Sequence, residues 1–228
     1  MKKNLCIVLM NIIALLFFIC SVNAQVIVQV KAQIENSLLT YMNGKYELCG
    51  DIICIDSAKN EKRADFEKIA DPYNTLHECY LFIAKTQNED DEKFAVGVYK
   101  NNSIIWMTDS LDGNYSLGQV EAVFDINRDG FVELVINFYH KGPDLDSDMW
   151  IFSWNGTNGW IINGVDETGS TVIDTYCILE DVNGDGVYEL VGERPVFDEN
   201  GNYKSPQKFL IVWNGREYVI GSNTTEKK

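Results

Sequence analysis

Residues 125–135 read DINRDGFVELV, and residues 181–191 read DVNGDGVYELV. In both stretches acidic and amide side chains stand at alternate positions, and a strand-like segment follows directly. Such a loop turns its alternate side chains towards a common centre, and the glycine at its sixth position permits a sharp turn. The sequence therefore predicts two copies of one unit, in which an acidic loop leads into a β-strand.

Hairpin patterns recur at nearly the same spacing as the acidic loops. Aligning the loops places WNG at 154–156 opposite WNG at 213–215, and Asn-Gly is a strong signal for a two-residue hairpin turn. Segments 93–107 and 40–50 supply further hairpins, the latter centred on Asn43-Gly44. The residues at the tryptophan position of the four hairpins are Met42, Tyr99, Trp154 and Trp213. These patterns predict an all-β fold of tandem antiparallel β-hairpin repeats, arranged as a short propeller-like ring or as an open β-stack.

The repeat period also predicts how the chain is divided. The expected segments are a signal peptide at 1–24, a partial unit at 25–69, a repeat with a degenerate loop at 70–118, repeats with intact acidic loops at 119–174 and 175–222, and a polar tail at 223–228. In the degenerate loop Asp71 keeps the first acidic position, but Tyr73, Thr75 and Cys79 replace the later polar ligands. Segments 28–42 and 60–70 have helical features that do not outweigh the all-β pattern.

The two intact loops have the composition of calcium sites. Ca²⁺ takes six to eight oxygen ligands in flexible geometry, and each loop offers three carboxylates, an amide and a backbone carbonyl. The expected ligands are Asp125, Asn127, Asp129, the carbonyl of Phe131 and Glu133 in the first loop, and Asp181, Asn183, Asp185, the carbonyl of Val187 and Glu189 in the second. An EF-hand is excluded, because its twelfth position needs a glutamate and these loops have Ile136 and Gly192 there.

The stretches VFDINRDGFVELV and LEDVNGDGVYELV resemble the calcium loops of FG-GAP or VCBS-type repeats, the blades of integrin α-subunit propellers and of many secreted bacterial proteins. The resemblance implies calcium sites with ligands at positions 1, 3, 5, 7 and 9 of each loop, which fall on the residues just named. It also implies a role in adhesion and recognition. The chain departs from the repeat pattern in having Glu at position 9 and in lacking the Phe-Gly and Gly-Ala-Pro signatures.

Composition limits the classes of partner. The net charge is −15, and removal of Lys2 and Lys3 with the signal peptide changes 19 basic residues to 17 against 34 acidic ones, or about −17. Nucleic acid is thus an unsuitable partner, whereas cations or a basic protein fit.

The four cysteines outside the signal peptide, Cys49, Cys54, Cys79 and Cys177, are expected to be structural thiols or disulfides of undetermined pairing. No motif of a known enzyme class stands out, since His77 and His140 are isolated, and we expect no catalytic activity.

A second polar loop occurs in each unit, at 88–92, 144–148 and 198–202. Equivalent positions would place these loops on one side as an acidic rim.

With the bacterial-type signal peptide, the expected function is that of a secreted or periplasmic calcium-binding recognition module whose partner is a protein or glycan. The alternative is a periplasmic inhibitor or immunity-type protein, which caps a basic enzyme such as a cell-wall hydrolase.

Overall fold

The described residues form an all-β structure with one helical segment at its start. The computed structural model describes residues 25–55, 61–63, 67–69, 73, 75–88, 92–111, 114–142, 147–164, 173, 175–194, 196, 198, 200 and 202–221. The predicted signal peptide and the polar tail at 223–228 lie outside these residues. The all-β prediction is confirmed: strands in three sheets make up most of the described chain. No helix among the described residues has the length and apolar character needed to cross a membrane.

Each sheet is built on an antiparallel meander of four strands that follow one another in the sheet. The first contains β1 (Tyr46–Cys54), β4 (Tyr80–Thr86), β5 (Phe94–Lys100) and β6 (Ser103–Met107). The second contains β7 (Tyr115–Phe124), β8 (Val132–His140), β9 (Ser147–Trp154) and β10 (Gly159–Ile161). The third contains β11 (Cys177–Glu180), β12 (Glu189–Arg194), β13 (Gln207–Trp213) and β14 (Tyr218–Ile220). One sheet is therefore the structural repeat.

The strand register confirms that the second and third sheets are equivalent. Leu134, nine residues after Asp125, pairs with Phe152, which lies two residues before Trp154. Leu190, nine residues after Asp181, pairs with Ile211, which lies two residues before Trp213. The two tryptophans thus occupy the same place relative to the acidic loops, as the spacing predicts.

The Asn-Gly turns differ from the two-residue turns that the sequence predicts. Trp154 pairs with Gly159, so the loop between β9 and β10 has four residues, and the Asn155 side chain accepts hydrogen bonds from the amides of Thr157 and Asn158. Asn214 makes the equivalent bonds to Arg216 and Glu217 in the third sheet. An asparagine side chain that accepts bonds from the following amides stabilises this longer turn, which explains the difference.

The start of the chain departs from the predicted hairpin at 43–44. Residues 25–40 are helical and continue into the 3-10 turn η1 (Tyr41–Gly44), which leads into β1. Val30, Ile34 and Leu38 stand at i, i+4 spacing within the segment that has helical features, and all three are buried against the first sheet. The hairpin prediction was wrong because packing of this apolar stripe stabilises a helix, and the glycine follows it as part of the turn.

Segment 60–70 also differs from its helix-forming composition. It contributes β2 (Glu61–Arg63) and β3 (Glu67–Ile69), which pair antiparallel, and Ile69 pairs with Val123 at the edge of the second sheet. Pairing with an existing sheet outweighs the weak intrinsic preference of such a short segment for helix.

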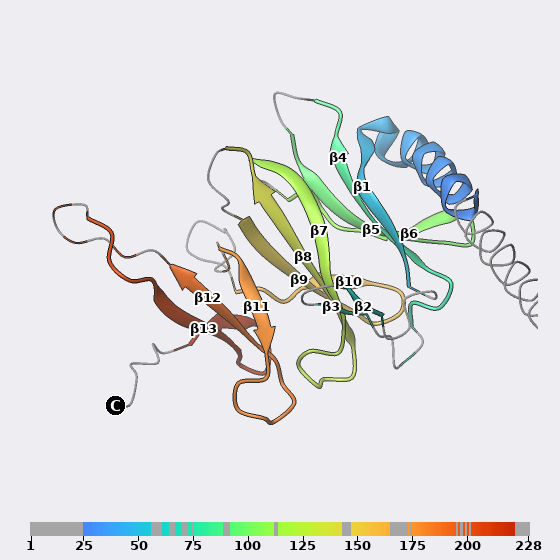
Figure 1. Cartoon of the computed structure of the whole chain (residues 1–228). Coiled ribbons are helices and arrows are strands. Elements are labelled where there is room, and N and C mark those ends of the chain that lie inside the picture. The colour runs from blue at the N-terminus through green and yellow to red at the C-terminus, as the bar shows by residue number, and fades with distance from the viewer. Residues whose placement is uncertain are drawn as a thin grey trace, which may run out of the picture.

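The sheets stack as layers around separate cores. One core lies between the first and second sheets, with Val96 and Leu134 at its centre, and another lies between the second and third, with Val135 and Ile211. A third core joins the helix over 25–40 to the outer face of the first sheet. Among the described residues no core cluster joins the first sheet to the third, and Figure 1 shows the second sheet between them. This is the open β-stack of the two predicted arrangements.

The loops at the two ends of the stack have different character. The β7–β8 and β11–β12 loops, which contain the two acidic motifs, emerge at the lower end of their sheets in Figure 1, and the β8–β9 and β12–β13 connections emerge at the opposite end. The stack therefore carries the two acidic loops on one end. No disulfide joins the four described cysteines, of which Cys79 and Cys177 are buried.

Candidate metal centre

The two acidic loops have the same backbone conformation, fixed by the same four hydrogen bonds. In both loops a side-chain oxygen accepts each bond and a backbone amide donates it. The side chain at position 9 accepts from the amide of position 2, and the side chain at position 1 accepts from the amide of position 6. The side chain at position 3 accepts from the amide of position 5, and the side chain at position 5 accepts from the amide of position 7. In the first loop these bonds join Glu133 to Ile126, Asp125 to Gly130, Asn127 to Asp129, and Asp129 to Phe131, over 2.9–3.2 Å. In the second they join Glu189 to Val182, Asp181 to Gly186, Asn183 to Asp185, and Asp185 to Val187, over 2.8–3.0 Å.

Left-handed backbone at positions 4 and 6 makes this conformation possible. Gly130 and Gly186 have φ of +92° and +85°, which side chains disfavour, so glycine is required at the sixth position. The fourth position is Gly184 in the second loop but Arg128 in the first, with φ of +60°. The first loop therefore stores some backbone strain at Arg128.

In the first loop the structure gathers three carboxylates. Asp125, Asp129 and Glu133 each present an oxygen, and these oxygens all lie within 4.8 Å of one another. The Oδ1 atom of Asp125 is buried and has no hydrogen-bond partner. Among the described residues, no lysine or arginine forms an ion pair with any of the three. A buried, unpaired carboxylate oxygen beside two other carboxylates fits a cation well, because both its desolvation and the mutual repulsion are then offset.

Glu133 is fully buried, and its environment raises its pKa to about 8. Burial is the largest cause, and the charges of Asp129 and Asp125 add to it, while the hydrogen bonds from Ile126 and Ser153 act in the opposite direction. Ser153 pairs with Glu133 across the strands and donates its hydroxyl to Oε1 over 2.9 Å. The carboxyl is thus held in place inside the sheet, in an environment that disfavours its charge.

The second loop holds its carboxylates further apart. Among the described residues, only the first loop brings three such ligand atoms within 4.8 Å. Val212, which precedes Trp213 as Ser153 precedes Trp154, has no hydroxyl to offer Glu189. The Glu189 carboxylate instead accepts from the Asn183 side chain over 3.3 Å. One apolar position in the neighbouring strand thus accounts for the different arrangement.

Two residues outside the predicted ligands connect successive loops. The Tyr73 hydroxyl donates to Asp125 Oδ2 over 2.5 Å, and this bond raises the pKa of Tyr73. The Arg128 guanidinium donates to the backbone carbonyl of Asp185 over 2.5 Å. The sequence predicts neither contact: Tyr73 stands where the degenerate loop lacks a polar ligand, and the first residue of that loop, Asp71, lies outside the described residues. The mismatch of Arg128 with Gly184 in the repeat alignment was the available signal.

Of the predicted ligand side chains, the structure brings together the carboxylates of Asp125, Asp129 and Glu133. In both loops the side chains at positions 1, 3, 5 and 9 accept hydrogen bonds from amides of their own loop. Phe131 and Val187, expected to contribute carbonyls, donate their amides to the carboxylate at position 5. The Phe131 ring packs edge-on against Trp160, with ring centroids 5.4 Å apart, and so lies outside the carboxylate cluster.

The predicted acidic rim is only partly described, since residues 89–91, 143–146, 199 and 201 lie outside the described chain. The described acids of these loops are engaged within the fold. Glu92 forms ion pairs with Lys85 and Lys141, and Asp148 accepts from Tyr115 over 2.6 Å and lies 3.1 Å from His140. Among the described acids of the rim, only Glu92 is paired with lysines, and nothing in these contacts tests the inhibitor hypothesis, which stays a prediction.

Comparison of the chain with protein-family models, with curated proteins and with solved structures found no match. The interpretation of the acidic loops thus depends on their own geometry and on the resemblance of their sequences to calcium-binding repeats.

Proposed function

We propose that the protein is a secreted or periplasmic calcium-binding repeat protein, in which Ca²⁺ stabilises the acidic loops and the stacked sheets serve as a recognition module. The observation that supports this most strongly is the carboxylate cluster of Asp125, Asp129 and Glu133 with its buried, unpartnered oxygen. Calcium has a structural role in this proposal and takes part in no reaction.

The chemistry of the donors favours calcium over other metals. The loops offer carboxylate and amide oxygens with no histidine or cysteine among the predicted ligands, which disfavours zinc and copper. A set of carboxylate and amide ligands along a nine-residue loop suits the variable geometry of Ca²⁺ better than the strict octahedron of Mg²⁺. Asp125, Asn127, Asp129 and Glu133 would hold the first ion, and their counterparts in the second loop would hold the second.

Calcium titration tests the proposal directly. For a Kd on the order of 10⁻⁴ M, typical of extracellular sites, about 1 mM free Ca²⁺ stabilises the fold by roughly 1.4 kcal/mol per site. This raises the melting temperature by a few degrees in a domain of this size. Asp129→Asn should remove the contribution of the first site and Asp185→Asn that of the second, each leaving the other.

A matched control separates metal binding from loss of turn hydrogen bonds. Asp198 also fixes its own loop by accepting bonds from the amides of Asn200 and Asn202, but it belongs to neither acidic motif. Asp198→Asn should leave the calcium-dependent rise unchanged. A melting temperature that responds neither to calcium nor to chelator, together with no heat of binding at millimolar calcium, would refute the proposal.

A further inference from the structure

A groove between the last strands of the first and second sheets offers a place for a different ligand. It is lined by residues 106–111 of the first sheet and its continuation, and by Phe152 and residues 159–161 of the second. Its volume of about 260 Å³ lies below the roughly 300–1,000 Å³ typical of pockets for drug-sized ligands. The groove therefore has the size for one small group or one side chain.

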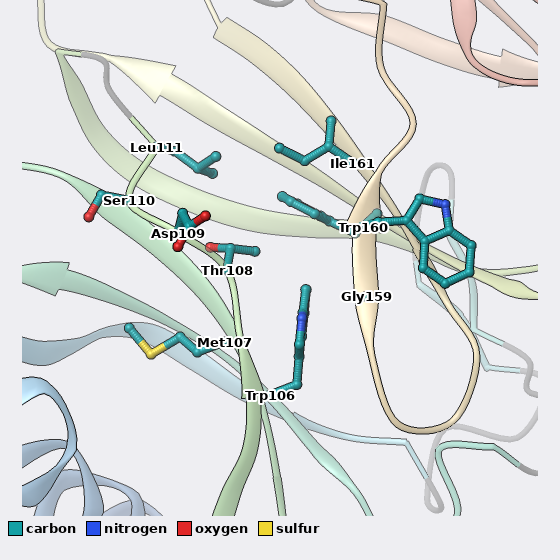
Figure 2. A pocket seen from close by; sticks show the side chains of 10 residues that line it. Trp106, Met107, Thr108, Asp109, Ser110, Leu111, Gly159, Trp160 and Ile161 are labelled. Carbon is teal, nitrogen blue, oxygen red and sulfur yellow. The ribbon is translucent and has the colours of Figure 1, made fainter.

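An indole ring held by packing forms one wall of the groove. Trp106 is half-buried, and its ring centroid lies 5.5 Å from that of Trp154 and 6.0 Å from that of Phe152. Gly159 leaves room for this ring, because a Cβ there would lie 2.4 Å from it. Figure 2 shows the Trp106 indole standing between the segment that carries Thr108 and strand β10, whereas the Trp160 indole points to the other side of β10.

The groove contains two hydroxyls that take part in hydrogen bonds and one carboxylate. The Thr108 hydroxyl accepts from the amide of Val96 over 3.1 Å, and the Ser110 hydroxyl shares a hydrogen bond of 2.5 Å with the Tyr46 hydroxyl. The Asp109 carboxylate is exposed, lies across the groove from Ile161 in Figure 2, and has no hydrogen bond or ion pair within the described part of the chain. Among the residues that the structure describes, no basic side chain lines the groove.

We propose that this groove binds an alkylammonium group, carried by a lysine side chain or by a free amine. The face of an indole attracts a cation through its quadrupole, and an adjacent carboxylate pairs with the same charge. The charge of the carboxylate and the quadrupole of the indole face favour a cation over a neutral sugar. The net charge of −15 favours the approach of a cation. The inference names a ligand class for the recognition role proposed above and rests on that role, but not on calcium.

Fluorine NMR of the protein labelled with 5-fluorotryptophan tests the proposal, using pentylammonium as the probe and 1-pentanol as its neutral counterpart. The chain has five tryptophans, and a Trp106→Leu variant identifies the resonance of Trp106. We expect pentylammonium to shift this resonance in a saturable way and 1-pentanol to bind at least several-fold more weakly. Asp109→Asn should weaken pentylammonium binding by about 2–5-fold, whereas Glu193→Gln, which removes an exposed charge outside the groove, should not.

Two further arms identify the source of the amine and separate this proposal from the calcium proposal. Binding of an acetylated Gly-Lys-Gly amide at least as tightly as pentylammonium assigns the site to a protein side chain, and preference for the free amine assigns it to a small molecule. The titrations are repeated in calcium and in chelator, alongside the melting temperature. Equal binding of pentanol and pentylammonium, or a Trp106 resonance that does not move, overturns the alkylammonium site even where calcium still raises the melting temperature.

Discussion

The buried carboxyl of Glu133 should give the calcium-free protein a stability that falls as the pH rises. Its pKa in the folded protein is raised to about 8, whereas a glutamate in an unfolded chain titrates near 4.3. The folded state therefore holds one proton more than the unfolded state between these values. Stability is fully present below the unfolded pKa and is lost progressively as the pH rises towards the folded pKa.

The expected size of this effect follows from the proton difference. One proton corresponds to about 1.4 kcal/mol per pH unit, so raising the pH from about 5.5 to 7.5 should lower the free energy of unfolding by about 2–3 kcal/mol. With a urea m-value of about 2 kcal/mol/M, the midpoint falls by about 1 M. Urea unfolding in chelator, at several pH values, measures this slope.

Two variants and a measurement in saturating calcium separate the contribution of Glu133 to the pH dependence of stability from that of other groups. Glu133→Gln cannot ionise, so the difference in stability between wild type and variant should itself fall by about 2–3 kcal/mol across that range. Asp129→Asn removes a charge that raises the Glu133 pKa, and so should reduce the slope. Saturating calcium favours the ionised carboxylate and should flatten it. Parallel pH curves for wild type and Glu133→Gln in chelator would show that the carboxyl is not the cause.

Three other predictions concern the loops, the first sheet and the thiols. Gly130→Ala should lower the free energy of unfolding by about 1–2 kcal/mol. The cost is purely conformational, because φ is +92° and nothing within 4 Å would meet the new methyl group. Urea unfolding measures this loss, and an unchanged midpoint would contradict the left-handed turn. Gly97→Ala should cost about 1–3 kcal/mol by overpacking, since its Cβ would lie 2.2 Å from the buried Phe82 ring; the double variant with Phe82→Leu should regain part of this loss, and no recovery would argue against the clash. A thiol reagent should modify the buried Cys79 and Cys177 only when the protein unfolds. It should modify Cys49 slowly in the native protein, because burial raises the pKa of the Cys49 thiol. Mass spectrometry of the modified peptides measures the order of modification, and a different order would contradict the prediction.

Local features of the fold were predictable because their causes lie within a few residues. The acidic motifs specify their own loops: each carboxylate or amide at an odd position bonds to an amide that is two, five or seven residues away. The position of Trp154 and Trp213 followed from the repeat period alone. By contrast, the sequence at the start of the chain is compatible with a helix over 25–40 and with a hairpin centred on Asn43-Gly44. Burial of Val30, Ile34 and Leu38 against the first sheet favours the helix.

Contacts between repeats could not be predicted from one sequence, because they join residues more than fifty positions apart. Tyr73 reaches Asp125 and Arg128 reaches Asp185 only because successive sheets stack with their loops on one end. The same holds for the groove at Trp106, whose second wall belongs to the next sheet. The ligand set of each loop is thus local information, whereas the surroundings that tune it come from the stack.

The glutamate at position 9, where the resembling repeats have aspartate, has a physical explanation in the way that each loop meets its sheet. The backbone of Glu133 already pairs with Ser153 in the neighbouring strand, while its carboxylate reaches back to the amide of Ile126 near the start of the loop. Glu189 reaches Val182 in the same way. The additional methylene of glutamate lets one residue begin the strand and still close the loop. Closure draws the carboxylate into the buried sheet, which raises the Glu133 pKa to about 8, so that the carboxyl holds a proton at neutral pH in the absence of metal. Under the calcium proposal the ion displaces this proton, so the glutamate at position 9 makes calcium binding depend on pH.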